Sequence, residues 1–476
     1  LTGIEVTAVL NVGLVQINNR FSGQCYLPLS VGMIQAYIEK NAPGKYNFLL
    51  PIYAREKVDI AVGKLLTADV VFFSIYVWNE RISIEIAKRL KAKRPHTLIA
   101  FGGPQVPDKQ VASFVAANPF IDAIVHGEGE FAAHAVLRYG AHFGKSPWLK
   151  PLIIHGDRSK SPSDLPSPYL SGTFDALMAA NPQEKWIGLW ETNRGCPFSC
   201  TFCDWGSATA SKVFPFDIDR LYAEVNWFAD HRIEFVFCCA ANFGILARDS
   251  DLASYVAEVK NKTGYPKALS VQATKNATER AYNTQKILAD AGLNKGVDIA
   301  LQSGDPATLQ AIKRDNISTK TYHDLQQRFI KDGIETYTDL ILGLPGETYD
   351  SFVKTVNQLI SNGQHNRIQF NNLSILPNAE MGDPVYQAKY GLIMVEGPAV
   401  NIHGAKDEEE IQERQVLVVG TATMPPDAWR EARVFAWMAA LLHFDKLLQL
   451  PFRELHKQGV SYLELVEHFL SATSPI

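Results

Sequence analysis

Hydrophobic positions divide the chain into two blocks, and each block alternates short apolar runs with amphipathic stretches. The apolar runs of the first block are rich in β-branched residues and have the length of buried parallel strands. Strands are therefore predicted at residues 4–10, 48–51, 70–75, 98–101 and 121–125, with helices at 29–40 and 81–94. Five strands joined by crossover helices indicate a Rossmann-like domain over residues 1–150, with its ligand at the carboxyl ends of the strands.

The second block repeats the alternation at a longer spacing. Strands are predicted at residues 187–192, 234–239, 268–274, 296–301, 336–342 and 367–374, and helices at 251–262, 277–291, 322–331 and 349–362. Six β/α units are fewer than the eight that close a barrel, so a partial (β/α)6 barrel of the TIM type is expected. It is assigned to residues 181–383, with its chemistry where the strands end.

The rest of the chain connects or follows these two blocks. A Pro/Ser-rich stretch at 156–168 cannot form a packed element and marks a linker over residues 151–180. Beyond the barrel the strand–helix rhythm stops. An acidic run at 407–410 and an amphipathic, aromatic-rich stretch at 428–450 indicate a small helical C-terminal region over residues 384–476. The predicted fold class is α/β.

Composition limits the cellular compartment and the classes of partner to be expected. Of the 476 residues 20% are charged, the formal net charge is −4, and no basic run would follow a nucleic acid or an anionic membrane. No apolar run approaches the roughly 18 residues of a membrane span, and the amino end lacks a signal-peptide pattern. Three of the six cysteines fall within eight positions, which suits a metal site in reducing cytoplasm. We expect a cytoplasmic protein with neither nucleic acid nor membrane as partner.

These three cysteines carry the strongest chemical signal. Cys196, Cys200 and Cys203 have Cys-x3-Cys-x2-Cys spacing, on a loop that Gly195 and Pro197 can turn. Thiolates so close in the chain can converge on one metal centre, but a structural zinc site needs four ligands and no fourth lies at suitable spacing. An iron–sulfur cluster held by three thiolates leaves one iron open to chelate an amine and a carboxylate. Three unrelated core cysteines are the remaining alternative.

This spacing on this loop of a six-unit barrel resembles the radical S-adenosylmethionine (SAM) superfamily. The resemblance implies a [4Fe-4S] cluster on the three cysteines and reductive cleavage of SAM. Phe202 matches the aromatic residue against which the adenine packs. Superfamily members carry a Gly-Gly-Glu-like stretch after the second strand, which meets the amino group of SAM. Here Ala241 and Asn242 occupy that place without a carboxylate, so a backbone carbonyl or the amide is expected to serve.

Later strand ends extend the resemblance. It assigns Gln302 and Ser303, after the fourth strand, to the ribose or the carboxylate of SAM, and Leu342 and Gly343, at the fifth, to the adenine. Arg314 could pair with the cofactor carboxylate, but a solvated arginine at a helix end is the expected role. The other cysteines, Cys25, Cys238 and Cys239, are predicted to be core residues.

The first block lacks the Gly-x-Gly-x-x-Gly dinucleotide fingerprint after its first strand. Its glycines follow the fourth and fifth strands instead, and this pattern over about residues 6–143 resembles the cobalamin-binding domain of many radical SAM enzymes. Glycines that only shape strand–helix turns are the alternative. The resemblance implies cobalamin contacts from Pro28, Ser74, Tyr76, Val77, Trp78, Gly102, Gly103, Pro104, Gln105, Gly127, Glu128, Gly129 and Glu130.

The expected lower face of the cobalamin has no histidine ligand. Domains that supply one carry Asp-x-His-x-x-Gly after the first strand, whereas residues 16–23 contain no histidine. The loop at 74–79 is expected to line this face, where Tyr76 or Trp78 would crowd the cobalt. Trp78 as an ordinary core residue is the alternative.

Together the two blocks resemble cobalamin-dependent radical SAM enzymes, and the expected activity is methylation of an unactivated carbon. In that reaction a 5′-deoxyadenosyl radical takes a hydrogen from the substrate, which then accepts methyl from methylcobalamin. The resemblance implies a cluster, SAM and cobalamin, a small-molecule or peptide substrate, and an electron donor such as flavodoxin or ferredoxin. The alternatives are a cobalamin-dependent rearrangement or cyclisation, and a non-catalytic cobalamin or redox sensor. A methylthiotransferase is disfavoured, because the first block has no second cysteine triad.

Overall fold

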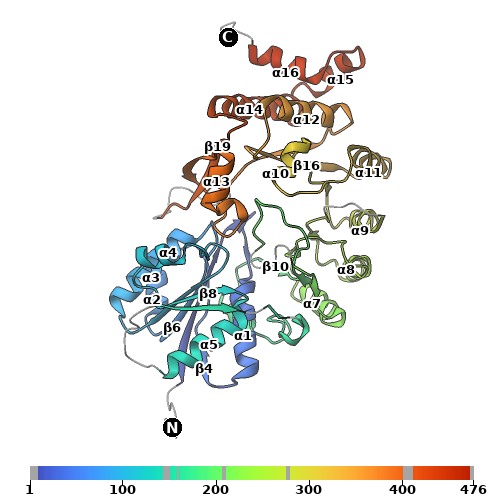
Figure 1. Ribbon diagram of the computed structural model, residues 1–476. Helices are drawn as coiled ribbons and strands as arrows, with labels where there is room; N and C mark the ends of the chain where they lie inside the picture. Colours follow the sequence, from blue (N-terminus) through green and yellow to red (C-terminus); the bar gives the residue numbers. More distant parts are fainter. Residues whose placement is uncertain are drawn as a thin grey trace.

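The computed structural model describes residues 9–142, 151–156, 158–159, 161–205, 211–274, 279–399 and 411–471. Two α/β bodies lie side by side, and the C-terminal elements lie across one end of the molecule (Figure 1). Within the described residues, none of the helices combines the length and the apolar character that a membrane span requires.

The first body is a doubly wound parallel sheet. Its strands are β1 (Leu10–Asn18), β4 (Tyr46–Phe48), β5 (Ile52–Ala54), β6 (Val70–Ser74), β7 (Leu98–Gly102), β8 (Ala123–Gly127) and β9 (Leu152–Gly156). They lie in the order β4-β1-β6-β7-β8-β9, and β5 pairs with the later part of β1. Apolar side chains of α1 (Leu29–Asn41) and α5 (Gly129–His142) cover one face. Those of α2 (Val58–Leu65), α3 (Glu80–Lys93) and α4 (Val111–Ala117) cover the other.

Two of the five strands predicted for this body are corrected by the structure. The first strand was predicted at 4–10, but residues 1–8 lie outside the described part, and the strand begins at Leu10. The strand predicted at 48–51 is wrong, because β4 ends at Phe48 and β5 begins only at Ile52. Leu50 between them is exposed, and Pro51 has no amide hydrogen for a ladder. The other three predicted strands are present as β6, β7 and β8.

The second body is the partial barrel. Its strands are β10 (Trp186–Trp190), β13 (Phe235–Cys238), β14 (Ala268–Ser270), β15 (Val297–Asp298), β16 (Thr336–Leu342) and β17 (Arg367–Asn372). Between them lie α7 (Ile218–Asp230), α8 (Asp249–Thr263), α9 (Glu279–Asp290), α10 (Pro306–Ala311), α11 (Thr319–Lys331) and α12 (Tyr349–Ser361). Figure 1 shows the larger helices along the outer side of the strands. The six predicted strands and four predicted helices are confirmed, although several strands are shorter than predicted.

A hairpin from the first body extends the sheet of the second. It consists of β2 (Arg20–Phe21) and β3 (Gln24–Tyr26), and β3 runs parallel to β10. The resulting order is β14-β13-β10-β3-β2. Arg20 adds a bidentate ion pair with Glu184, with Nη–Oε distances of 2.7 and 2.9 Å. The two bodies are therefore joined by this sheet as well as by the connecting chain. Within the linker predicted at residues 151–180, Leu152–Gly156 form β9 of the first body and Asp175–Ala180 form α6.

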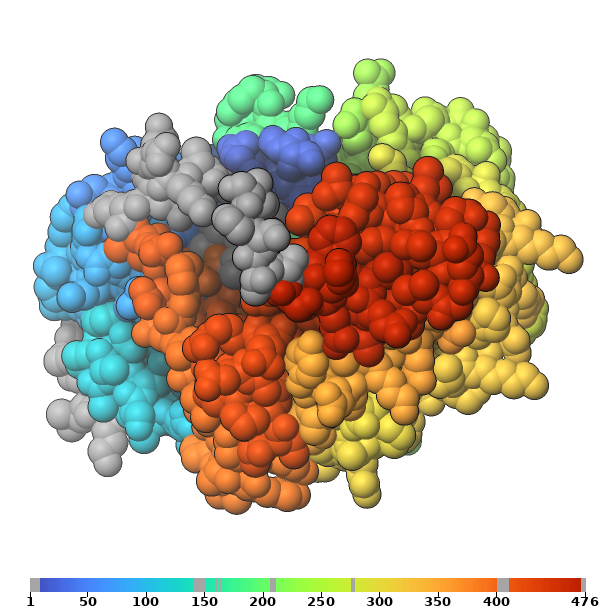
Figure 2. Space-filling model, turned by 90° about the horizontal axis from the view of Figure 1, so that it is seen from above, coloured from blue at the N-terminus to red at the C-terminus, as the bar shows by residue number. Residues whose placement is uncertain are grey.

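The C-terminal region is helical with one β-hairpin. It comprises α13 (Pro384–Tyr390), the antiparallel pair β18 (Ile393–Pro398) and β19 (Arg414–Gly420), α14 (Pro426–Ala439), a π-helical turn (Ala440–Phe444), α15 (Gln449–Lys457) and α16 (Tyr462–Ser471). The helical prediction is confirmed, but the hairpin was missed, and the acidic run at 407–410 lies outside the described residues. In Figure 2 the orange part of this region lies between the blue first body and the yellow part of the barrel.

Candidate cofactor-binding site

The cysteine loop follows the carboxyl end of β10. Cys196 and Cys200 are buried and Cys203 is half-buried, in a turn where the Cys203 amide donates to the Cys200 carbonyl (3.1 Å). The loop begins at β11 (Asn193–Arg194), which pairs with β12 (Phe214–Pro215). Gly195 has φ +106°, and a Cβ there would lie 2.0 Å from the Lys212 carbonyl oxygen, so this position admits only glycine.

Two polar side chains contact the buried thiols. The Asn242 amide donates to the Sγ of Cys196 (3.3 Å), and the Arg314 guanidinium faces Cys200. Among the described residues, no three His, Cys, Asp or Glu side chains are already grouped closely enough to hold a metal ion. The three thiols would therefore have to turn toward a common centre when a cluster binds.

Arg314 is not the solvated arginine that the sequence predicted. It is only 4% exposed, because the chain reverses after α10 through Lys313 at φ +51°. Its guanidinium donates to the carbonyl of Ala300 and to Asn316 Oδ1. Burial lowers the pKa of Arg314, and the neighbouring Cys200 and Asp298 oppose that shift. No sequence motif marks this contact, because it depends on the positive φ of Lys313.

The predicted SAM residues lie at successive strand ends. Gln302, at φ +68°, exchanges backbone hydrogen bonds with β16. Ser303 is buried and donates to Glu347 Oε1 (2.7 Å), and burial raises the pKa of Glu347 to about 8. Gly343 has φ +91° at the end of β16, next to Leu342.

Trp429, at this end of the barrel, was not predicted as a site residue. A Cβ at Gly343 would lie 3.3 Å from the indole nitrogen of Trp429, which α14 contributes from the C-terminal region. Phe202 packs against the apolar cluster that includes Leu344, so the loop and the end of β16 are neighbours. No periodicity within α14 distinguishes Trp429 from an ordinary buried aromatic residue.

Unpartnered polar atoms provide a test of whether a polar ligand fits here. Four buried side-chain oxygens at the ends of barrel strands or just beyond them have no hydrogen-bond partner, namely Asn242 Oδ1, Asp298 Oδ1, Glu347 Oε2 and Asn372 Oδ1. Burial and the neighbouring Asp339 raise the pKa of Asp298. Buried polar groups normally find partners, so this set fits a ligand that carries an ammonium, hydroxyl or amino groups, as SAM does.

The candidate cobalamin surface lies at the strand ends of the first body. Tyr76 and Trp78 stack with ring centroids 4.5 Å apart, and both are half-buried. The hydroxyls of Tyr76 and Ser74 lie within hydrogen-bond distance of Ser30 (3.2 and 3.1 Å). Buried Asn79 accepts from the Tyr76 amide and donates to the carbonyls of Ile17 and Ser74. The loop is therefore held in shape by its own hydrogen bonds.

A residue of the C-terminal region supports this loop. The buried carboxylate of Glu413 accepts from the amides of Arg81 and Ile82 at the start of α3 (2.7 and 3.0 Å). Arg55 connects Glu413 to the loop, because its guanidinium donates both to Glu413 and to the carbonyl of Trp78. The segment at 16–23, where a histidine was absent, forms part of β1 and the β2–β3 hairpin.

The glycines of the first body have a structural explanation. A Cβ at Gly103 would lie 2.5 Å from the Ile75 carbonyl oxygen, and one at Gly127 would lie 2.4 Å from the Gly156 carbonyl oxygen. Both residues have positive φ. Since the chain's own backbone accounts for them, these glycines give little support to cobalamin binding.

Glu128 and Glu130, also implied as cobalamin contacts, bind a residue of the barrel. Arg194 donates to Glu128 Oε2 (3.1 Å) and to Glu130 Oε1 (2.6 Å). Gln105 donates to Glu80 (3.0 Å), and the Asn378 amide donates to the carbonyl of Pro104 (2.9 Å). Several predicted cobalamin residues thus contact the second body or its C-terminal region.

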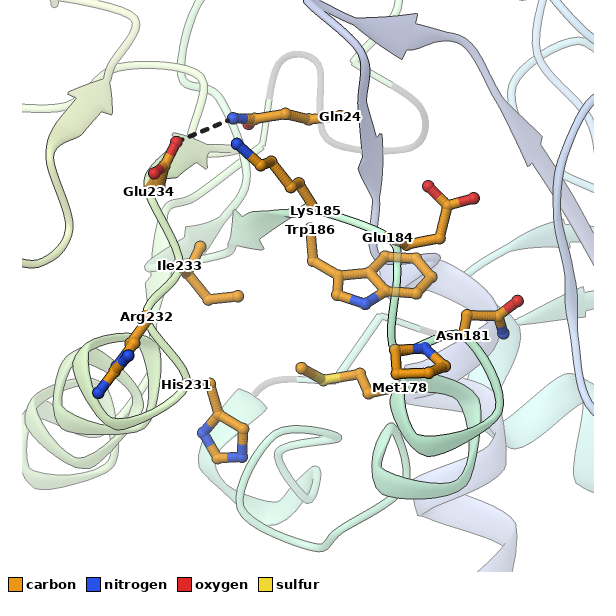
Figure 3. Close-up of a pocket in the computed structure, with 11 residues that line it drawn as sticks. Gln24, Met178, Asn181, Glu184, Lys185, Trp186, His231, Arg232, Ile233 and Glu234 are labelled. Carbon is orange, nitrogen blue, oxygen red and sulfur yellow. Dashed lines mark hydrogen bonds between the residues drawn. The ribbon is translucent and has the colours of Figure 1, made fainter.

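A separate cavity lies at the opposite ends of the barrel strands (Figure 3). It has a volume of about 390 Å³ and is lined by Trp186, where β10 begins, and by Ile233, just before β13. Gln24 of the hairpin donates to Glu234 at its edge (3.3 Å). Because the cysteine loop follows the carboxyl end of β10, this cavity is not part of the cofactor site.

Known proteins share these features. The model of the Radical SAM superfamily matches residues 190–359. The chain is 37% identical over 461 residues to the cobalamin-dependent radical SAM methyltransferase TokK of Streptomyces tokunonensis, covering 93% of this chain and 67% of that protein. It is 36% identical over 474 residues to the 2-(S-pantetheinyl)-carbapenam-3-carboxylate methyltransferase of Streptantibioticus cattleyicolor, covering 94% and 68%.

A solved structure has the same fold. The radical SAM methyltransferase TsrM from Kitasatospora setae superimposes with a TM-score of 0.64 at 15% identity, covering 90% of this chain and 88% of that one. The fold and the cysteine loop thus define a radical SAM enzyme. The identity over nearly the whole chain then shows that it belongs to the family of cobalamin-dependent radical SAM methyltransferases.

Proposed function

We propose that this methyltransferase acts on an unactivated carbon of a small-molecule carboxylate, and that pantetheinylated carbapenam carboxylates are its substrate class. The observation that supports this is the 36% identity over 94% of the chain to the carbapenam methyltransferase. The electron donor is proposed to be a flavodoxin or a ferredoxin in the cytoplasm. A cytoplasmic location agrees with a cysteine loop that has to stay reduced.

Cys196, Cys200 and Cys203 are proposed to hold a [4Fe-4S] cluster with one open iron. Asn242 donates a hydrogen bond to Cys196 in this structure, and Arg314 places a positive charge beside Cys200. A donor and a cation next to thiolates stabilise their negative charge. When bound, the reduced cluster and SAM supply a 5′-deoxyadenosyl radical, and methylcobalamin supplies the methyl group.

The barrel residues are proposed to orient SAM. The unpartnered Oδ1 of Asn242 can accept from the amino group, in the place where relatives of this fold carry a carboxylate. Ser303 and Glu347 form a buried hydrogen-bonded pair, and the Oε2 of Glu347 has no hydrogen-bond partner. Gly343, which has no side chain, and Phe202, which packs against the neighbouring apolar cluster, are proposed to contact the adenine.

The first body is proposed to bind cobalamin over the loop at 74–79. The Tyr76–Trp78 stack presents flat aromatic surface, and neither ring carries a strong ligand for cobalt. These rings would keep water away from bound cobalamin and would offer the cobalt no strong ligand. Pro28, Val77 and the Gly102–Gln105 and Gly127–Gly129 turns would complete the surface.

The test is an anaerobic assay of the reconstituted full chain. It contains a chemical reductant, cobalamin, SAM with a trideuterated methyl group, and 2-(S-pantetheinyl)-carbapenam-3-carboxylate. We expect 5′-deoxyadenosine and a product heavier by one labelled methyl group, and neither with the Cys200→Ala variant. An altered product without label would support a rearrangement or cyclisation instead. Absence of 5′-deoxyadenosine with an intact cluster would leave only the sensor.

A further inference from the structure

Arg194 lies two residues before Cys196 and binds three carboxylates at once. Its side chain is 12% exposed. It donates from Nη1 to Glu128 (3.1 Å), from Nη2 to Glu130 (2.6 Å), and from Nε and Nη2 to both oxygens of Glu191 (3.0 and 3.1 Å). The buried carboxylates around it raise its pKa well above the usual value despite the cost of burial.

The carboxylates come from both bodies. Glu191 follows β10 in the barrel, whereas Glu128 and Glu130 lie at the turn from β8 into α5 of the first body. Their side chains are only 7% and 5% exposed. Arg194 is therefore a junction between the loop that carries the cysteines and a strand-end turn of the other body.

A second route joins the same two places. Arg158 in the linker lies 3.5 Å from Glu128 Oε1 and donates to the hydroxyl of Ser211. The Ser211 amide in turn donates to the Cys196 carbonyl (2.8 Å). The turn at Glu128 is thus connected to the cysteine loop on both sides of Cys196.

This arrangement depends on the shape of a guanidinium. Its planar fork serves several carboxylates in fixed directions, which an ammonium group cannot do. Burying three carboxylates with two arginines contributes little net stability, because each charge loses its hydration. Its effect is orientation, since the hydrogen bonds hold only in one relative placement of the two bodies.

We propose that Arg194, with Glu128 and Glu130, is a positioning residue that aligns the cysteine loop with the strand ends of the first body. This inference rests on the proposed function, which places one cofactor on each side. Methyl transfer needs the substrate held between them, and misplacement by about 1 Å can cost on the order of 100-fold. Cleavage of SAM occurs within the barrel alone. A substitution that weakens the hydrogen bonds of Arg194 should therefore impair methyl transfer more than radical formation.

The main test uses Arg194→Lys and Glu130→Gln in the reconstituted full chain. Arg220→Lys is the matched control, because that side chain is also 12% exposed and forms its ion pair, with buried Glu224, within one helix of the barrel. Its guanidinium also contacts the Leu165 carbonyl (2.6 Å) and the Met33 sulfur (3.9 Å), which lie outside residues 123–130 and 193–203. The ratio of methylated product to 5′-deoxyadenosine is measured with the carbapenam substrate. We expect it to fall by about 10-fold or more in Arg194→Lys and Glu130→Gln. Arg220→Lys should keep the wild-type ratio.

Amide hydrogen exchange gives a readout that does not depend on activity or substrate. Arg194→Lys should raise exchange at residues 123–130 of the other body, and Glu130→Gln should raise it at 193–203. Arg220→Lys should raise neither. Unchanged exchange across the junction in both variants, or an equal effect in Arg220→Lys, would overturn the inference. If the wild-type chain forms no product, but the two variants still show the reciprocal rise in exchange, only the proposed function is contradicted.

Discussion

The two candidate cofactor surfaces are both built on carboxyl ends of parallel strands, but their polar groups are in opposite states. In the barrel, Asn242, Glu347 and Asn372 each retain a buried oxygen without a partner. In the loop of the first body, Ser74, Tyr76 and Asn79 are all hydrogen-bonded within the protein. The difference indicates how each surface recognises its ligand. Under the proposed assignment, the barrel would bind its ligand through specific polar contacts, and the loop would bind its ligand through the shape of an aromatic surface.

The largest expected effect comes from removing the centre of the polar surface. Cys200→Ala should lower 5′-deoxyadenosine formation below detection, because a cluster needs all three thiolates to keep a single open iron. Iron content and the absorption spectrum of the reconstituted protein measure the loss. Cys25→Ala, at a buried cysteine of the core, should retain full iron content. Normal 5′-deoxyadenosine from Cys200→Ala would break the assignment of the loop.

A change at Asn242 distinguishes polar contact from packing. Asn242→Ala removes the donor to Cys196 and the free oxygen proposed for SAM. We expect the KM for SAM to rise by about 10- to 150-fold, the range of one hydrogen bond to a charged group. Gln326→Ala, at a buried amide of the barrel that donates to Gln364 (2.7 Å), is the control. An equal rise in both variants would argue for a general loosening of the barrel.

Truncating the aromatic surface should have the next largest effect. Trp78→Ala removes the partner of Tyr76 and opens the proposed lower face, so methyl transfer should fall by roughly 10-fold. Trp78→Phe keeps a stacked ring and should lose far less. The visible spectrum of bound cobalamin is the second measurement, since water reaching the cobalt shifts it. If Trp78→Ala changes neither rate nor spectrum, Trp78 is an ordinary core residue.

The smallest expected effect is a pH dependence where the first body meets the C-terminal region. Burial raises the pKa of Glu80 to about 7. A hydrogen bond from Gln105 opposes this shift, and the nearby carboxylate of Glu413 adds to it. The folded state thus favours the protonated acid. The contribution of Glu80 to the stability of the folded protein is fully present below about pH 4.5 and is lost as the pH rises through about 7.

Glu80→Gln should therefore raise stability at pH 8 by on the order of 1 kcal/mol and have little effect at pH 4.5. Thermal unfolding of both proteins at the two pH values measures this difference. Glu258→Gln, at an exposed position, should show no such pH dependence. A larger gain at low pH than at pH 8 would contradict the sign.

The sequence predicted single helices and strands better than the contacts between residues far apart in the chain. The strand at 336–342 was predicted to the residue, because its run of β-branched, aromatic and aliphatic residues ends at a glycine. The hairpin at 20–26 was missed, since its pairing partner lies about 160 residues away at β10. The cysteine loop was recognised from spacing alone. Arg194 and Arg314 were not assigned their roles, because an arginine's partners depend on which strands the fold brings together.

The hairpin shared between the two bodies also constrains the order of folding. Most of the first body is synthesised before β10, but β3 cannot find its neighbour until residues 186–190 have emerged. During that interval the hairpin presents an unpaired strand edge, of the kind that invites pairing with other chains. This contact of high sequence separation is expected to form late and slowly. A chain that ended between the two bodies would keep that edge permanently exposed. The first body alone is therefore expected to aggregate more readily than the full chain.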